Sequence, residues 1–183
     1  MKQVNIVVGV TGSIAVYKAC DLVRQLQKQG MNVDVVMTKE AQAFITPLTF
    51  QSLANGSVYT DMFATPDRHD IEHIALAKKA QVIVVAPATA NCIGKIANGI
   101  YDDLLTCVIA ASRAAVIFAP AMNTGMYSNR VVQDNIKKLK SLGVRFVGPR
   151  TGELACAEKG QGCLEEIEEI VRSVQAAVRS LKR

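Results

Sequence analysis

Short apolar runs separated by helical patterns are the feature of this sequence that most restricts its fold. Residues 4–10 form a near-continuous apolar run, which is typical of a strand buried on both faces of a sheet. Similar runs follow at residues 33–37, 82–86, 116–119 and 144–147. The stretches between them show the three- and four-residue apolar spacing of amphipathic helices. We therefore predict a doubly wound, Rossmann-like parallel sheet with right-handed crossovers, in a three-layer α/β/α arrangement.

The helices of this arrangement are predicted from their start and stop signals. The first begins after Gly12 and ends at Gly30, because glycine commonly terminates helices. The second begins at Thr46 and Pro47, a cap followed by proline at the first helical position, and ends near residue 56. Further helices are expected at residues 70–77, 128–142 and 164–181, with two short ones between 90 and 111 and a short strand at 58–59. A chain of 183 residues fits one domain, residues 1–183.

Composition and charge argue against several classes of protein. No apolar run approaches the roughly 20 residues of a membrane-spanning helix, and the N-terminus lacks a signal-peptide pattern, so we expect a cytoplasmic protein without membrane contact. The net charge is +5, but there is no basic run and only 5% of residues are aromatic. This argues against nucleic acid as a partner and suits an anionic small molecule. The five cysteines show no metal-ligand spacing, so no metal site or disulfide framework is predicted.

Hydroxyl side chains follow several of the predicted strands, at Thr11, Ser13, Thr38 and Thr89. Ligands of such sheets bind where the strands end. A nicotinamide-binding domain would carry Asp or Glu for the ribose at the position of Thr38. Hydroxyls together with backbone amides at helix starts suit a single phosphate instead, and we therefore expect FMN. The alternative is that Ser13 and Thr38 only cap helices.

Two further positions suggest chemistry. His73 lies in the first turn of a predicted helix, where the helix dipole disfavours the imidazolium and leaves a ring able to accept a proton. The alternative is an ordinary surface histidine. Asn123 follows the strand at 116–119, and its amide can donate to a carboxylate without adding charge. The alternative is a helix-entry turn in which Met122 and Met126 belong to the core.

The segment 151–162, TGELACAEKGQG, places Cys156 among polar residues and three glycines. Free cysteine is usually buried like a small hydrophobe, and this segment has no apolar run in which to bury one. Its composition alone assigns no role to the thiol.

Together these loops resemble the homo-oligomeric flavin-containing cysteine decarboxylases. The resemblance covers nearly the whole chain and rests on the segments GVTGSIA (9–15), HIALA (73–77), PATANC (87–92), PAMNTGMY (120–127) and LAC (154–156). It implies catalytic roles for His73 and Cys156. The implied substrate-binding residues are Asn123, Met122, Met126 and Ala155. The implied FMN-binding residues are Gly12, Ser13, Ile14, Thr38, Thr89, Ala90, Asn91 and Cys92.

Within this family, the chain is most similar to the members that decarboxylate 4'-phosphopantothenoylcysteine to 4'-phosphopantetheine in coenzyme A biosynthesis. The resemblance implies a reaction through a thioaldehyde and an enethiol, and trimers, or dodecamers built of trimers, with active sites between subunits. It also implies a separate or fused phosphopantothenate–cysteine ligase as a partner. Two departures stand out. In the flavin motif at 87–92, Cys92 replaces a threonine. In the substrate-covering loop that the family calls a clamp, Ala157 replaces the glycine that usually follows the cysteine at position 156.

Related groups offer alternatives. Peptidyl-cysteine decarboxylases share the histidine and the asparagine but generally lack the clamp cysteine. Flavin prenyltransferases of the same fold lack the Pro-Ala-Met-Asn segment. Non-enzymatic FMN-binding regulatory subunits carry acidic tails, whereas this sequence ends in Leu-Lys-Arg.

Overall fold

The computed structural model describes residues 3–63, 72–155 and 159–181. At its centre is a six-stranded sheet in the order β3-β2-β1-β4-β5-β6, and every neighbouring pair runs parallel. The strands are β1 (Asn5–Val10), β2 (Asn32–Met37), β3 (Val58–Tyr59), β4 (Val82–Ala88), β5 (Ala115–Pro120) and β6 (Arg145–Phe146). The predicted doubly wound parallel sheet is confirmed, and its strand order reverses between β1 and β4, where such sheets bind ligands.

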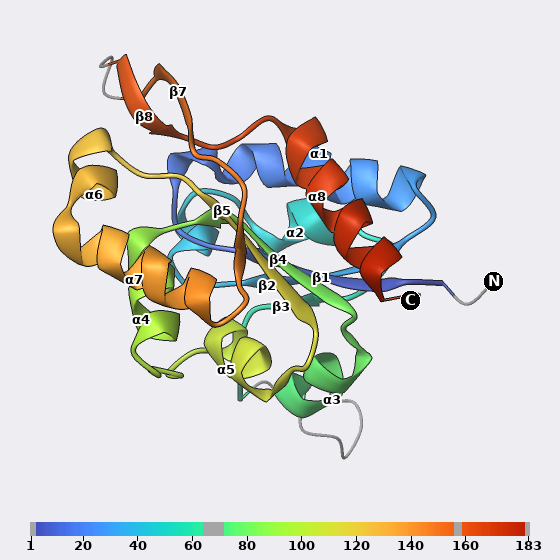
Figure 1. Cartoon of the computed structure of the whole chain (residues 1–183). Coiled ribbons are helices and arrows are strands. Elements are labelled where there is room, and N and C mark those ends of the chain that lie inside the picture. Colours follow the sequence, from blue (N-terminus) through green and yellow to red (C-terminus); the bar gives the residue numbers. More distant parts are fainter. Residues whose placement is uncertain (1–2, 64–71, 156–158, 182–183) are drawn as a thin grey trace.

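Helices cover both faces of the sheet and give the three layers visible in Figure 1. One face packs against α1 (Lys18–Lys28), α2 (Pro47–Gln51) and α8 (Ile167–Ser180). The other packs against α3 (Glu72–Lys79), α4 (Ala90–Ala97), α5 (Leu104–Ala111) and α7 (Arg130–Ser141). Three short helical elements lie between these: η1 (Ile14–Tyr17), η2 (Ala41–Ala43) and α6 (Thr124–Ser128). No helix in the described residues has both the length and the apolar character needed to cross a membrane.

Strand β1 explains why the predicted runs are apolar throughout. Ile6 and Val8 are buried in the cluster that contains α1 and α8, whereas Val7 is buried in the cluster on the opposite face. Successive side chains of a strand point to opposite faces, so a strand between two helical layers needs apolar residues at every position. Helix α5 packs so closely here that a Cβ atom on Gly9 would lie 2.6 Å from Leu105 Cδ1.

Two predicted helices differ from the structure. The helix expected at 128–142 is α7, which begins at Arg130 and follows the separate short helix α6, because the intervening Asn129 is not helical (φ −59°, ψ 131°). Its side chain accepts a hydrogen bond from the backbone N–H of Val131 at 2.9 Å and so caps α7. The helix expected to reach residue 56 ends at Gln51. Asn55 instead accepts from the Val33 N–H, which ties this loop to β2.

An antiparallel hairpin, β7 (Arg150–Glu153) and β8 (Lys159–Cys163), was not predicted. The strand at 144–147, expected to be the last, is the short β6. The hairpin escapes prediction because it lacks alternating apolar residues and pairs Gly152 with Gly160. It docks on the segment after β5, where the Met122 N–H donates to the Gly162 carbonyl at 3.0 Å. Cys156 and Ala157 lie outside the described residues.

Candidate active site

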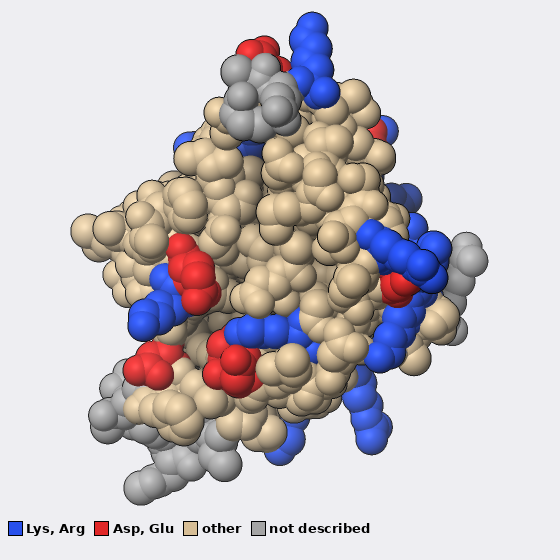
Figure 2. Space-filling view, turned by 90° about the vertical axis from the view of Figure 1, so that its left-hand side faces the viewer, with Lys and Arg blue, Asp and Glu red and all other residues tan. Residues whose placement is uncertain are grey.

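The loops at the carboxyl edge of the sheet surround two adjoining cavities. The larger has a volume of about 580 Å³ and the smaller about 290 Å³. Ser13, Ala121 and Met122 line both. Figure 2 faces this side of the molecule and shows a hollowed, largely uncharged centre, with charged side chains below it and at the sides. Two adjoining cavities at the point where the strand order reverses make this edge the candidate active site.

The smaller cavity brings together the predicted hydroxyl residues and most of the predicted flavin motif. Its lining includes Thr11, Gly12, Ser13, Thr38, Thr89, Ala90, Asn91, Cys92 and Met126. Of the residues assigned to the cofactor by resemblance, Ile14 lines the larger cavity instead. Met126, assigned to the substrate, lines this smaller cavity.

The hydroxyl side chains cap local turns, as the simpler alternative predicted. Ser13 Oγ accepts from the Ala15 N–H at 3.3 Å, and Thr38 Oγ1 accepts from the Ala41 N–H at 3.4 Å. Thr89 Oγ1 accepts from the N–H of Cys92 at 3.3 Å and caps α4. In each contact the hydroxyl oxygen is the acceptor, so its own proton remains a donor for a ligand. Capping and ligand binding are therefore compatible at these positions.

Thr11 has a different role from the other hydroxyl residues. It is buried, its Oγ1 donates to the Pro87 carbonyl at 2.7 Å, and it accepts from the Thr89 N–H at 3.1 Å. These bonds fix the loop after β1 to the loop after β4. A second close approach occurs at Gly12, where a Cβ atom would lie 2.5 Å from Glu40 Cβ. The glycine therefore permits the loops after β1 and β2 to touch.

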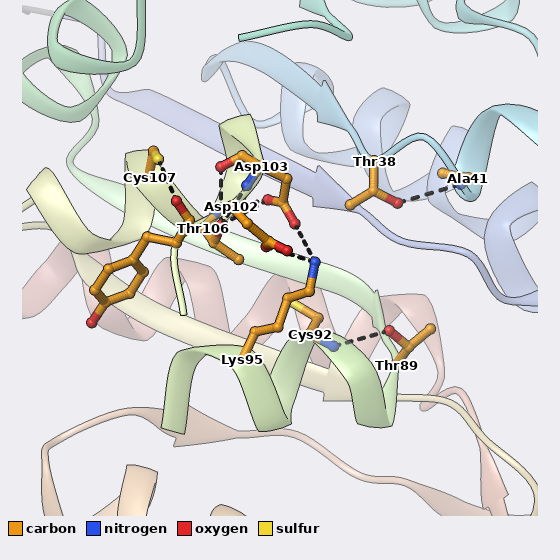
Figure 3. A network of polar contacts seen from close by, with 10 residues as sticks. Thr38, Ala41, Thr89, Cys92, Lys95, Asp102, Asp103, Thr106 and Cys107 are labelled. Carbon is orange, nitrogen blue, oxygen red and sulfur yellow. Dashed lines mark hydrogen bonds and ion pairs between the residues drawn. The ribbon is translucent and has the colours of Figure 1, made fainter. Parts of the chain in front are cut away.

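One wall of the smaller cavity is polar and is shown in Figure 3. Lys95 Nζ lies 2.7 Å from Asp102 Oδ1 and 3.2 Å from Asp103 Oδ2. The hydrogen bond to Asp102 is the main reason that the pKa of Lys95 is raised. Burial, followed by the nearby Asp103 charge, raises the pKa of Cys92 to about 12. The cysteine that replaces the expected threonine is therefore a neutral thiol at physiological pH.

The larger cavity contains Asn123, Met122 and Ala155, three of the predicted substrate residues. Asn123 stands at the N-terminus of α6, and its Oδ1 accepts from the Gly125 N–H at 2.8 Å. This bond orients the side-chain amide by local structure. Met122 is 9% exposed and packs in the core, whereas Met126 is 50% exposed. The prediction that both methionines could belong to the core holds for Met122 only.

Two cations line the larger cavity that sequence reasoning did not identify. Lys18 is partly buried at the start of α1, and no ion pair found within the described parts of the chain involves it. Arg150 enters from β7, with its Nε 3.0 Å from Glu166 Oε1. Lys18 lies one helical turn beyond Ile14. This spacing could have indicated in the sequence that Lys18 faces the same cavity as Ile14. Arg150 had none, because the hairpin was not predicted.

The structure does not bring His73 to the same place. It is the second residue of α3 and lines neither of the two cavities. Its Nδ1 is buried, and no hydrogen-bond partner for it is found among residues 3–63, 72–155 and 159–181. A simple surface histidine would have its ring nitrogens in water. Residue 70, where this helix was predicted to begin, and the predicted catalytic Cys156 both lie outside the described residues.

Comparison with known proteins agrees with this site. A model of the family described as Flavoprotein matches residues 1–179. A coenzyme A biosynthesis bifunctional protein CoaBC from Bacillus subtilis (strain 168) is 50% identical over 168 residues, 92% of this chain and 41% of that protein. A probable phosphopantothenoylcysteine decarboxylase from Streptococcus mutans is 43% identical over 173 residues, 93% of this chain and 97% of that protein. The chain thus spans about two fifths of the bifunctional relatives and nearly all of the shorter one.

Solved structures give the same picture. A PPC decarboxylase mutant complexed with pantothenoylaminoethenethiol has a TM-score of 0.87 and 31% identity, covering 96% of this chain and 98% of that one. The FMN binding protein AtHal3 has a TM-score of 0.86 and 31% identity, covering 98% of both chains. These similarities confirm the resemblance read from the loops, and the chain belongs to the flavoprotein family.

Proposed function

We propose that this chain decarboxylates 4'-phosphopantothenoylcysteine to 4'-phosphopantetheine, a step of coenzyme A biosynthesis, with FMN as cofactor. The observation that carries the proposal is the adjacency of the two cavities, because the one suited to a cofactor phosphate shares a wall with the one that contains Asn123. The names of relatives that are 40–50% identical support this substrate. The flavoprotein family match and the FMN binding protein among the similar structures support the cofactor.

The smaller cavity fits FMN by the chemistry of its donors. Ser13, Thr38 and Thr89 offer hydroxyl protons, and the N-terminus of α4 opens onto the same space. Such a helix end favours an anion through its dipole and its backbone N–H groups. Apolar side chains, including Met122 and Met126, form the other wall and suit a flat aromatic ring.

The larger cavity fits a substrate with two anionic ends. Asn123 offers a neutral donor for the cysteine carboxylate, and Lys18 and Arg150 offer positive charge for the distant phosphate. Arginine and lysine are the usual protein partners of phosphate groups. This pair favours the phosphorylated substrate over a peptide that ends in cysteine, because the peptide carries no such phosphate.

The chain's own residues have distinct roles in this reaction. When bound, the flavin supplies a reversible acceptor for the hydride of the substrate's β-carbon, which side chains cannot supply. Asn123 orients the carboxylate through a neutral amide, and this avoids the ion pair that would stabilise the ground state against loss of CO2. We assign proton abstraction to His73 and protonation of the enethiolate to Cys156.

Assembly completes this proposal. His73 lines neither cavity of its own chain, so we assign it to the site of a neighbouring subunit in a homotrimer, alone or within a dodecamer. Ile14 and Tyr17, which are 57% and 61% exposed next to the larger cavity, give an apolar surface for that contact. The partner activity is phosphopantothenate–cysteine ligase, fused or separate, and the expected location is the cytoplasm.

A spectrum and a turnover assay test the proposal. Purified protein should show flavin absorption, release FMN on denaturation, and evolve CO2 from 4'-phosphopantothenoylcysteine. The unphosphorylated analogue should react more slowly, and Lys18→Met should reduce this preference while leaving the analogue's own rate similar. A protein that stays colourless after FMN is added, or that releases no CO2, would contradict the proposed function.

A further inference from the structure

The carboxylate of Asp103 occupies a defined position in the wall of the smaller cavity. Its Oδ1 accepts from the Thr106 N–H at 2.8 Å, in a capping box at the start of α5. The single hydroxyl proton of Thr106 Oγ1 is shared between this Oδ1 and the Asp103 carbonyl oxygen, each 2.9 Å away. Asp103 Oδ2 lies 3.2 Å from Lys95 Nζ. A carboxylate has about four acceptor positions, so these donors leave room for at least one more. The side chain is 28% exposed and lines the cavity.

Helix α4 provides the other half of this wall. Thr89, Cys92 and Lys95 follow one another at three-residue spacing and therefore lie on one side of the helix. Figure 3 shows them in a row that leads to Asp103 and Asp102. Lys95 contacts both carboxylates, but only Asp103 lines the cavity, whereas Asp102 has a side chain that is 58% exposed. The lysine thus fixes the position of Asp103 without entering the lining itself.

Among the described side chains that line the cavity, no other carboxylate is held in place by several donors. The cavity's hydroxyls and the α4 N-terminus are arranged to donate, and Glu40, the other carboxylate in the lining, is exposed to solvent. FMN carries donors of its own, the ring N3–H and the ribityl hydroxyls, and buried donors require acceptors. A phosphate next to Asp103 would be repelled, so the phosphate is better placed at the N-terminus of α4, and the Asp103 end of the wall suits an N–H or O–H group of FMN.

We propose that Asp103 accepts a hydrogen bond from an N–H or O–H group of bound FMN, and that Lys95 is a positioning residue for this carboxylate. The inference rests on the proposed function, since it requires FMN in the smaller cavity. It adds an acceptor that neither the flavin motif at 87–92 nor the hydroxyl pattern contains. Asp103 thereby determines which end of the cofactor faces α4 and α5.

The matched variants Asp103→Asn and Asp102→Asn test this contact. Each removes one carboxylate from Lys95, so their long-range electrostatic effects are alike. In Asp103→Asn the amide oxygen can keep the bonds to Thr106, and its nitrogen then presents a donor where the carboxylate accepted. We expect the FMN dissociation constant of Asp103→Asn to rise about tenfold or more, and that of Asp102→Asn to change by less than about twofold. Free-FMN fluorescence on dilution of the holoprotein measures both.

A flavin analogue identifies the donor group. Competition with 3-methyl-FMN, which lacks the N3–H, should show weaker binding to wild type but not to Asp103→Asn if Asp103 contacts N3–H. Equal discrimination by both proteins would assign the contact to a ribityl hydroxyl.

A second substitution controls for folding. Asp103→Ser caps α5 about as well as asparagine does, but its short hydroxyl does not extend into the cavity. It should unfold at a temperature close to that of wild type and weaken FMN binding as Asp103→Asn does. Equal FMN affinities in Asp103→Asn, Asp103→Ser and Asp102→Asn would overturn the inference. A wild-type protein that binds no FMN at all would instead refute the proposed function.

Discussion

Gly162 tests how the hairpin reaches the candidate site. Strand β8 passes so close to the segment after β5 that a Cβ atom on Gly162 would collide with the backbone oxygen of Met122. The Met122 N–H donates to the Gly162 carbonyl at the same place. A backbone oxygen cannot rotate away as a side chain can, so Gly162→Ala must displace the hairpin. The lost hydrogen bond costs about 1 kcal/mol, and the crowding adds about 1 kcal/mol or more.

A cost of about 2 kcal/mol lowers the equilibrium constant for docking of the hairpin by about 30-fold. Leu154 and Ala155, between its strands, line the larger cavity. When the hairpin is undocked, this part of the cavity wall is displaced and cannot hold the substrate. We expect kcat/KM for CO2 release to fall by about 10- to 30-fold. The unfolding temperature should fall by only a few degrees, because the central sheet and its two apolar clusters are not touched.

Gly152→Ala is the matched control in the partner strand of the same hairpin. A Cβ atom there would meet Arg150 Nη1 at 3.0 Å and Cys163 Sγ at 3.2 Å. Both are side-chain atoms that can move, so the hairpin should stay docked. Because Arg150 also serves the substrate phosphate, the comparison uses the unphosphorylated analogue, for which kcat/KM should stay within about threefold of wild type. Equal losses in the two variants, or wild-type turnover in Gly162→Ala, would refute the reasoning from docking.

Other changes test single residues. Asn123→Asp keeps an acceptor for the α6 cap but opposes the substrate's carboxylate, so kcat/KM should fall by about 100-fold or more. His73→Asn should retain FMN and lose about 100-fold or more in CO2 release. If each site takes His73 from one subunit and Asn123 from its neighbour, co-expression of His73→Asn with Asn123→Asp leaves about a quarter of the sites intact and should restore about that share of wild-type activity. If each chain forms its own site, no activity should return. Cys156→Ser should accumulate an enethiol about two mass units lighter than phosphopantetheine, whereas Cys163→Ser should turn over normally by mass spectrometry. Cys92, whose pKa is raised to about 12 by burial, should resist iodoacetamide at about pH 9 while Cys163 reacts.

The sheet could be predicted because its strands satisfy two constraints at once. Each long strand lies between two helical layers, so its sequence is apolar at most positions, with the ion-paired Asp34 of β2 as a buried exception. The helices between the strands fix the parallel direction. The helix ends were less predictable. Asn129 and Asn55 act through side-chain bonds to Val131 and Val33 that stop or shorten helices, and an asparagine in a sequence does not reveal which backbone group it will contact.

The candidate site was predictable to the extent that its residues follow strands. Thr38 and Thr89 come directly after strands and Asn123 three residues after one, so the parallel sheet alone places them at one edge. Arg150 and Asp103 reach the same edge by other means, through a hairpin without apolar alternation and through the cap of a helix. Such residues are indistinguishable in sequence from solvated charges, because their role depends on a cavity that exists only after folding.

His73 shows a different limit. Its position in a helix was predicted, yet the fold of one chain does not bring it to the cavity that contains Asn123. Strand order and helix packing within a chain determine only distances inside that chain. If both residues act on one substrate, the missing step is association, and the exposed apolar side chains of Ile14 and Tyr17 beside the larger cavity provide a surface for it.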